Sequence, residues 1–372
     1  MIFEHVNALT PDGTFREARV ETWKNKIIAV EYLQDGVKDG ADYLLPGLID
    51  LHLHGAMGAD ASDGNGIRKI REYEAGQGVT SILLATMTIS EPDLLKALSA
   101  IHAEMQQSIP TMADVLGVNL EGPFISPEKK GAQDADYIKT ADKSLFKKYQ
   151  KAAGGAIRIV GIAPEIRLNK KLIKWLDKQA IVSMAHTNAT KAVAEEAIAE
   201  GASHATHLYN AMRKWNDSDP GVAGAILEHP ETTAELIGDG IHVPAEQVTD
   251  LFRHMAGRIC LISDSIRATG MPDGTYMLGG HPVMKHGNKA VLEGTGCLAG
   301  SVTNLADVVR AVVHMGVPLE QAATAATMVP AARLGLSDRG YLLAGQKADL
   351  VRWAPDLTLK AVVKDGIFIK EL

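Results

Sequence analysis

The sequence has 372 residues, of which 46% are hydrophobic and 22% charged, enough apolar content for one large domain and a small accessory domain. The formal net charge of −7, without any run of lysines and arginines, argues against a nucleic-acid partner. The two cysteines, the absence of an apolar stretch of about 18 residues and an amino terminus without secretory-signal features lead us to expect a cytoplasmic protein with no membrane partner.

The two ends of the chain are predicted to be rich in β-structure. Residues 1–45 contain short apolar segments separated by turn signals such as Pro11-Asp12-Gly13. Residues 336–372 are also strand-like, and Lys364-Asp365-Gly366 is typical of a hairpin turn. We expect these two parts to pair into one small β-sandwich domain.

Residues 46–335 alternate apolar runs with helical stretches, which is typical of βα units around a parallel sheet. The apolar runs, in chain order, are YLLPGLIDLHLHG, TSILLAT, VLGVNLEG, IRIVGIAPE, AIVSMAHT, HATHLYN, AELIGDG and RICLISDS. The predicted helices cover about 66–77, 91–107, 141–153, 169–178, 190–200, 221–228, 244–255 and 302–315. Eight strands with eight helices predict a (β/α)₈ barrel of the TIM type as the catalytic domain. An open doubly wound sheet is the alternative, but no Gly-x-Gly-x-x-Gly follows the first strand.

Two segments interrupt this alternation. Residues 122–138 are polar and contain proline and glycine, which indicates a long functional loop after the third strand. Residues 275–294 have the alternation and turn residues of a small β excursion after the eighth strand.

In such a barrel the chemistry lies at the carboxyl ends of the strands. The polar residues predicted there are His52, His54, Glu121, His186, His207, His242 and Asp264. Each alone has an ordinary explanation, such as a hydrogen-bonded core histidine or a helix cap. Five histidines and two carboxylates on one face are far less plausible as a chance assembly.

Histidine nitrogens and carboxylate oxygens suit a divalent transition metal, with zinc or iron favoured. Five candidate ligands exceed what one tetrahedral zinc needs, so we predict one or two ions, with Glu121 able to bridge two positions. One position takes His52 and His54, and the other takes His186 and His207. A metal-activated water predicts hydrolysis, with Asp264 as the acid and base. The alternative role for Asp264 is that of a further ligand or a helix cap.

Several motifs together resemble the N-acetylglucosamine-6-phosphate deacetylase family of the amidohydrolase superfamily. The motifs are PGLIDLHLHG, LEGPFISPEKKGA, AHTNAT, THLYNAM, DGIHV and LISDSIRATGMPDG. The resemblance spans essentially the whole chain and implies a metal-dependent barrel, a small β domain from both termini and a homodimer. It also implies removal of acetate from N-acetylglucosamine 6-phosphate. The metal residues Glu121, His186 and His207 and the catalytic Asp264 match the family pattern, and His52 and His54 match members of the two-metal type.

The resemblance further implies a set of substrate contacts. These are Ala132, Gln133, Asn210, Ala211, Ser218, His242, Leu298, Ala299 and Gly300. Two of them depart from the family pattern, because Gln133 replaces a usual histidine and Ser218 replaces an arginine that meets the phosphate. Losing a guanidinium removes the bidentate partner best suited to a phosphate, although Arg213 and Lys214 offer positive charge nearby. The alternative substrates are therefore N-acetylgalactosamine 6-phosphate or an unphosphorylated or substituted N-acyl amino sugar.

Two further alternatives assign the chain a function other than amino-sugar deacetylation. A cyclic-amide hydrolase of the dihydroorotase type usually bridges its metals with a carboxylated lysine, and no lysine lies at the relevant strand ends. A non-catalytic barrel scaffold would have no need for a buried polar cluster that costs desolvation.

Overall fold

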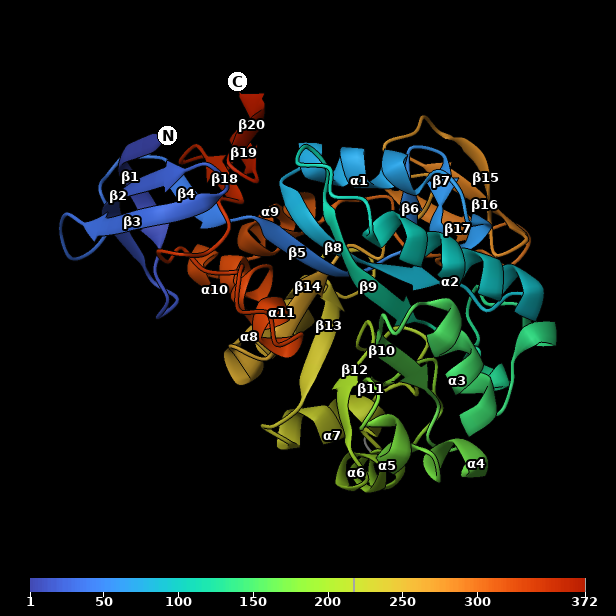
Figure 1. Cartoon of the computed structure of the whole chain (residues 1–372). Helices are drawn as coiled ribbons and strands as arrows, with labels where there is room; N and C mark the ends of the chain where they lie inside the picture. Colours follow the sequence, from blue (N-terminus) through green and yellow to red (C-terminus); the bar gives the residue numbers. More distant parts are fainter. Residues whose placement is uncertain (217, 372) are drawn as a thin grey trace.

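The computed structural model describes residues 1–216 and 218–371, and its centre is an eight-stranded parallel sheet (Figure 1). The strands pair in chain order: β5 (Leu48–Leu53), β8 (Val79–Thr86), β9 (Asp114–Leu120), β10 (Ile157–Ile162), β11 (Ile181–Met184), β12 (Ala202–Ala205), β13 (Thr233–Ile237) and β14 (Ile259–Ile262). The amide of Asp264, just after β14, donates to the carbonyl of His52 in β5 at 2.9 Å. This contact brings the last strand to the first, and the predicted (β/α)₈ barrel is confirmed.

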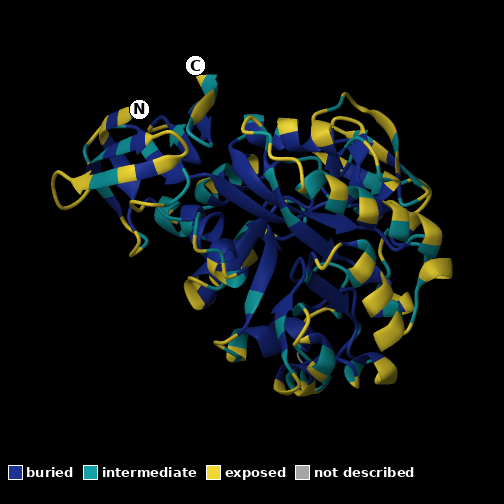
Figure 2. Ribbon diagram, viewed as in Figure 1, coloured by how far each residue is buried: buried dark blue, intermediate teal, exposed yellow. Residues whose placement is uncertain are grey.

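The barrel strands are buried along nearly their whole length (Figure 2). All eight residues of β8 are buried, as are all six of β5. Parallel strands covered by helices on one side and by barrel-interior side chains on the other need apolar residues at successive positions. The continuous apolar runs in the sequence have this origin.

Helices cover the outside of the barrel. They are α1 (Ile67–Gly76), α2 (Glu91–Met105), α3 (Lys143–Ala152), α4 (Arg167–Lys170), α5 (Ile173–Leu176), α6 (Lys191–Ala199), α7 (Gly221–Glu228), α8 (Ala245–Met255), α9 (Leu305–His314), α10 (Leu319–Ala325) and α11 (Met328–Arg333). Side chains cap several of them, and the oxygens of Ser90, Thr190 and Asn304 accept from the amides three residues later. No helix within the described residues is long and apolar enough to cross a membrane.

The helix predicted over 169–178 is instead two four-residue helices, α4 and α5. Asn169 is fully buried, and its side-chain amide donates to the carbonyl of Phe124 at 2.8 Å. Its side-chain oxygen accepts from the amide of Ala141 at 2.7 Å. From its place in α4, Asn169 therefore holds both ends of the long loop after β9.

The first predicted apolar run is divided between two sheets. Its first part, β4 (Tyr43–Pro46), belongs to a sheet built from the two ends of the chain, and its second part is the barrel strand β5. Gly47 lies between them, and a Cβ atom there would be 2.2 Å from Oγ1 of Thr80. Only glycine allows the chain to pass this closely to β8 as it enters the barrel.

The terminal sheet has seven strands. In addition to β4 they are β1 (Ile2–Leu9), β2 (Phe15–Trp23), β3 (Lys26–Tyr32), β18 (Leu350–Trp353), β19 (Leu359–Lys364) and β20 (Ile367–Glu371). Lys364 pairs with Ile367, and the two residues between them, Asp365 and Gly366, have φ of 48° and 75°. Positive φ at both positions is the requirement of a two-residue hairpin turn, so the predicted hairpin is confirmed.

Basic side chains from the carboxyl-terminal region attach this sheet to the barrel at Asp114, the first residue of β9. The Asp114 Oδ2 atom lies 2.7 Å from Nζ of Lys347, 2.8 Å from an Arg339 guanidinium nitrogen and 3.3 Å from Nζ of Lys364. These ion pairs join segments far apart in the chain at the amino-terminal end of the barrel strands.

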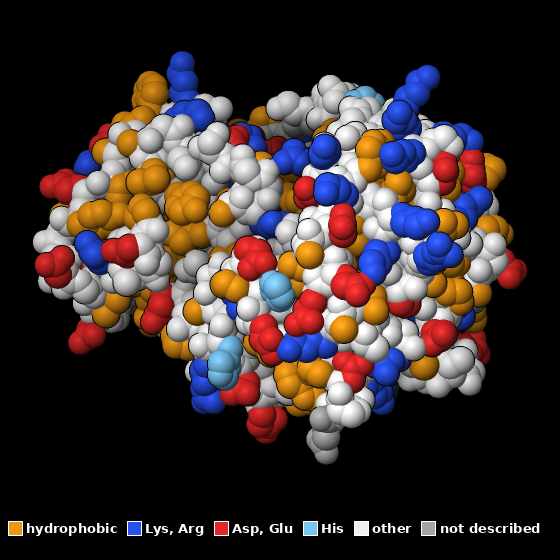
Figure 3. All heavy atoms as spheres, turned by 90° about the horizontal axis from the view of Figure 1, so that it is seen from below, with side chains coloured by type: hydrophobic (Ala, Val, Ile, Leu, Met, Phe, Trp, Pro, Cys, Tyr) orange, Lys and Arg blue, Asp and Glu red, His pale blue; other side chains and the backbone are white. Residues whose placement is uncertain are grey.

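The predicted excursion after β14 is a three-stranded antiparallel sheet, and this prediction is also confirmed. Its strands are β15 (Gly274–Leu278), β16 (His281–His286) and β17 (Lys289–Leu292), at the upper right of Figure 1. Short paired segments, β6 (Gly55–Ala56) and β7 (Ala59–Asp60), lie after β5. On the face drawn in Figure 3, basic side chains are frequent toward the upper right with acidic side chains among them, and hydrophobic side chains gather over the terminal sheet at the left.

Candidate metal-dependent active site

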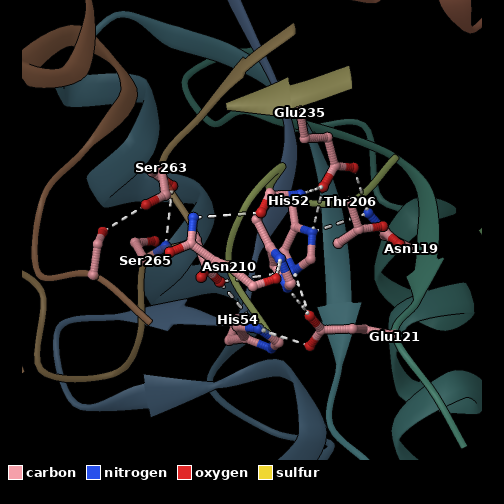
Figure 4. A network of polar contacts seen from close by, with 12 residues as sticks. His52, His54, Asn119, Glu121, Thr206, Asn210, Glu235, Ser263 and Ser265 are labelled. Carbon is pink, nitrogen blue, oxygen red and sulfur yellow. Dashed lines mark hydrogen bonds and ion pairs between the residues drawn. The ribbon is translucent and has the colours of Figure 1, made fainter. Parts of the chain in front are cut away.

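Four of the five predicted metal ligands, the histidines, converge on the fifth, Glu121, which follows β9. Nε2 of His186 and Nε2 of His207 lie 3.0 Å and 2.9 Å from Oε1 of Glu121. Nε2 of His54 lies 3.3 Å from Oε2, and Nε2 of His52 lies 3.5 Å from Oε1 (Figure 4). The ligand atoms form two groups, each within 4.8 Å, and both groups contain Glu121.

The backbone at three strand ends is unusual. His186, His207 and Asp264 have φ of 43°, 28° and 49°. Left-handed backbone is costly for residues with a Cβ atom and is found mainly where it serves a site. Here it turns the three side chains toward the same point at the carboxyl ends of the strands.

The ring orientations of His186 and His207 indicate that a cation fits between them and Glu121. Nδ1 of His186 lies 2.9 Å from the carbonyl of Lys129, and Nδ1 of His207 lies 3.1 Å from the carbonyl of Asn210. A carbonyl oxygen only accepts, so both Nδ1 atoms carry the hydrogen. In the neutral rings the Nε2 lone pairs then face a carboxylate oxygen, and two acceptors at this distance need a positive charge between them.

The charges of the cluster also favour a bound cation. Burial alone would lower the pKa of His52, but the carboxylates of Glu235 and Glu121 raise it to about 9. Nε2 of His52 is buried and has no hydrogen-bond partner among the described residues. None of the described lysines or arginines forms an ion pair with Glu121, Glu235 or Asp264. The residues therefore fit divalent cations, which would supply the charge that these carboxylates demand.

Asp264 lies on the His54 side of the cluster, with Oδ1 3.3 Å from Nε2 of His54. Burial would raise the pKa of Asp264, but the neighbouring histidines His54 and His52 hold it below its usual range. The carboxylate is therefore ionised near neutral pH and able to accept a proton.

A cavity of about 530 Å³ opens beside this cluster. The metal candidates His54, Glu121, His186 and His207 line it together with Asp264. Seven of the nine residues predicted to contact substrate also line it: Ala132, Gln133, Asn210, Ala211, His242, Leu298 and Gly300. The other two do not. Ala299 is buried behind the wall, and Ser218 is exposed with its hydroxyl donating to Oδ1 of Asn216 at 2.7 Å.

His242 is fixed by a carboxylate. Nδ1 of His242 donates to Oδ2 of Asp239 at 2.8 Å, and its Nε2 is buried, lies at the cavity and has no partner among the described residues. The imidazole is therefore oriented toward anything that occupies the cavity.

Gln133 contacts a candidate metal ligand directly. Its Nε2 donates to Oε2 of Glu121 at 2.7 Å, and its Oε1 accepts from the amide of Thr88 at 2.6 Å. Both hydrogen bonds are buried, so Gln133 fixes the rotation of the Glu121 carboxylate as well as lining the cavity.

The two basic residues after THLYNAM have different environments. Arg213 is engaged by Asp219, with its Nε 2.7 Å from Oδ2. Lys214 is the one lysine or arginine among the described residues that line the cavity, and none of the described carboxylates forms an ion pair with it. Lys214 therefore places a positive charge at the cavity wall.

Three further polar residues of the cluster were not anticipated from the sequence. Asn119, His204 and Glu235 are fully buried within barrel strands, and all three contact one another or His52. The available signal was a charged residue inside the apolar strand β13, where AELIG places one glutamate among aliphatic side chains. A carboxylate there needs polar partners inside the barrel.

Comparison with known proteins gives the same class of enzyme. Residues 43–368 match the sequence model described as the amidohydrolase family, so the chain is a hydrolase of that class. A Bacillus subtilis N-acetylglucosamine-6-phosphate deacetylase is 40% identical over 83% of this chain and 80% of its own length. The Escherichia coli O157:H7 N-acetylgalactosamine-6-phosphate deacetylase is 32% identical over 92% of each chain.

Solved structures agree with the sequence relatives. A Mycobacterium smegmatis N-acetyl-D-glucosamine-6-phosphate deacetylase variant, in complex with N-acetyl-D-glucosamine-6-phosphate, superposes with a TM-score of 0.92 at 30% identity over 99% of both chains. The Thermotoga maritima N-acetylglucosamine-6-phosphate deacetylase gives 0.90 at 30% identity over 100% of both. The chain belongs to the N-acetylglucosamine-6-phosphate deacetylase family of the amidohydrolases.

Proposed function

We propose that this protein hydrolyses the N-acetyl amide of N-acetylglucosamine 6-phosphate to give glucosamine 6-phosphate and acetate. The observation that carries the proposal is one cavity lined by candidate metal ligands, by Asp264 and by Lys214. The relative solved with N-acetyl-D-glucosamine-6-phosphate supports the choice of sugar, as does the 40% identity to the Bacillus subtilis enzyme.

In this proposal, Glu121, His186 and His207 hold one divalent ion, and His52, His54 and Glu121 hold a second. Zinc and iron suit this donor set. When bound, such an ion polarises the amide carbonyl and lowers the pKa of an adjacent water. Metal analysis of the purified protein tests this assignment, and an active protein without a transition metal would contradict it.

The side chains of the cavity have distinct roles in the reaction. Asp264 takes the proton from the attacking water and later passes it to the leaving nitrogen, which departs as the amine while the acetyl group leaves as acetate. His242, fixed by Asp239, directs Nε2 at the substrate and hydrogen-bonds it. Lys214 neutralises part of the phosphate charge.

The choice of sugar is tested by comparing acetate release from several compounds. We expect N-acetylglucosamine 6-phosphate to have the highest kcat/KM, and N-acetylglucosamine without phosphate to be much poorer. A higher value for N-acetylgalactosamine 6-phosphate would favour the second candidate, which the Escherichia coli relative supports. No acetate from any of them would contradict the proposed function.

The role of Lys214 is tested by Lys214→Met. Because a hydrogen bond to a charged group contributes about 1.5–3 kcal/mol, KM for the phosphorylated sugar should rise by about 10–100-fold. The value for the unphosphorylated sugar should not change. Lys191→Met is a suitable control, since Lys191 lies outside the cavity and pairs with Glu228.

The homodimer implied by the resemblance also remains a proposal. Trp215, next to Lys214, is 50% exposed and is a side chain that a partner subunit would bury. Sedimentation at several concentrations would measure the oligomeric state, and a monomer throughout would contradict it.

A further inference from the structure

Glu235 is a buried carboxylate that the proposed reaction does not use. It lies in the middle of β13 and is fully inaccessible to solvent. It belongs to neither group of candidate metal ligands, although its side chain points toward His52 of β5 (Figure 4). A carboxylate in such a place is costly unless its partners are well oriented.

Four groups surround the Glu235 carboxylate. Oε2 accepts from Nδ1 of His52 at 2.9 Å and from the amide of His207 at 3.3 Å. Oε1 accepts from Nδ2 of Asn119 at 3.1 Å and lies 3.4 Å from Nε2 of His204. No lysine or arginine of the described residues pairs with it, and two of its four partners, His52 and His207, are candidate metal ligands.

These contacts fix the ring of His52. A carboxylate only accepts hydrogen bonds, so Nδ1 of His52 carries the hydrogen and Nε2 is directed at the cluster. Nε2 lies 3.5 Å from Oε1 of Glu121 and 3.7 Å from Oδ1 of Asp264. Asn119 also donates to the carbonyl of Leu51 at 3.1 Å, which fixes the orientation of its own amide.

The two halves of the cluster are therefore supported differently. His186 and His207 are oriented by the neutral backbone carbonyls of Lys129 and Asn210. Among the four candidate metal histidines, His52 is the one whose Nδ1 meets a carboxylate of the described residues, which holds the ring and makes its Nε2 a stronger electron donor.

We propose that Glu235 is a positioning residue that sets the metal affinity of the His52/His54 position and leaves that of the His186/His207 position unchanged. This inference rests on the proposed two-ion site. Its test measures metal binding and not turnover, so the two proposals can fail separately: a protein that binds metal as expected but releases no acetate contradicts only the proposed function.

The test titrates the metal-free full chain with Zn²⁺ in competition with a coloured chelator. We expect the wild-type protein to take up two equivalents. Glu235→Gln keeps the shape but removes the charge, and should weaken one equivalent by about 10–100-fold while the other is unchanged. Ser183→Ala is the matched control, because it removes a buried barrel hydrogen bond to Thr206 that does not reach His52.

Other results would overturn the proposal. These are no change in either equivalent for Glu235→Gln, an equal loss of both, or a wild-type protein that binds one equivalent unaffected by His52→Gln.

A second comparison covers the case in which Glu235→Gln does not fold. The double variant His52→Gln/Glu235→Gln removes both members of the buried pair and leaves neither charge unpartnered. If Glu235 acts through His52, the double variant binds metal as His52→Gln alone does. A further loss of the remaining ion in the double variant would contradict this role.

Discussion

Asp264 is the residue on which the proposed chemistry depends most directly. It is ionised and faces the cavity, but its Oδ1 is also 3.3 Å from a candidate metal ligand, His54. Asp264→Asn keeps the size of the side chain and removes its ability to take a proton. We expect kcat to fall by about 10²–10⁴-fold, the range for loss of a general base, with metal content unchanged. Loss of an ion on dialysis would instead assign Asp264 as a ligand.

Gln133 has a structural role that can be measured apart from catalysis. Gln133→Met matches its length but removes both buried hydrogen bonds, leaving the amide of Thr88 without an acceptor. The free energy of unfolding should fall by about 1–3 kcal/mol, the cost of an unsatisfied buried group. Chemical denaturation gives this value, and an unchanged midpoint and slope would show that the Gln133 side chain is not held as described.

At the scale of single residues, the sequence predicted the candidate ligands at or near the strand ends and missed three other polar residues that, like His52, lie within strands. His52, Glu121 and His186 could be predicted to meet because all barrel strands end on one face. Asn119 and Glu235 lie within strands and face the barrel interior, and no spacing rule says which interior residues touch. Ser218 lies away from the cavity because its turn is closed by local hydrogen bonds to Asn216, which only the folded loop reveals.

At the scale of secondary-structure elements, Asp114 connects β9 to the carboxyl-terminal region. Burial would raise the pKa of Asp114, but Lys364 and Arg339 lower it to about 2. The folded-state pKa thus lies below the unfolded value, so the carboxylate stabilises the fold above about pH 4 and loses this effect as the pH falls toward 2.

The variant Asp114→Asn tests this connection. A shift from 3.8 to about 2 corresponds to about 2 kcal/mol of stability at neutral pH. Urea denaturation should show the variant less stable by this order at pH 7, with the difference closing as the pH falls from about 4 toward 2. A gap that stays constant with pH would mean that the ion pairs contribute nothing and that packing alone was lost.

Most elements followed from hydrophobic periodicity, and the exceptions have local causes. The apolar run around Gly47 contains two strands in different sheets, because composition does not reveal where a chain crosses from one sheet to another. The helix predicted over 169–178 is two short helices, and Asn169 in the first of them holds the preceding loop. The short helices α10 and α11 were not anticipated, since they pack against the barrel strands β5 and β14 and lack a clear polar face.

At the scale of the whole molecule, metal binding should contribute to the stability of the fold. Three buried carboxylates, Glu121, Glu235 and Asp264, lie close together, and none of the described lysines or arginines pairs with them. An ion that binds only the folded state stabilises it by about 4 kcal/mol at a thousandfold excess over its Kd. Removal by a chelator should therefore lower the melting temperature, and added Zn²⁺ should restore it. The same melting temperature with and without chelator would contradict this.

The two cysteines of the chain differ sharply in their surroundings. Cys260 is buried in β14, whereas Cys297 is exposed and belongs to the cavity wall beside Leu298. A maleimide should therefore label the folded protein once, at the entrance to the cavity. Glucosamine 6-phosphate should slow that labelling, so a fluorophore on Cys297 would report occupancy of the cavity without any measurement of turnover.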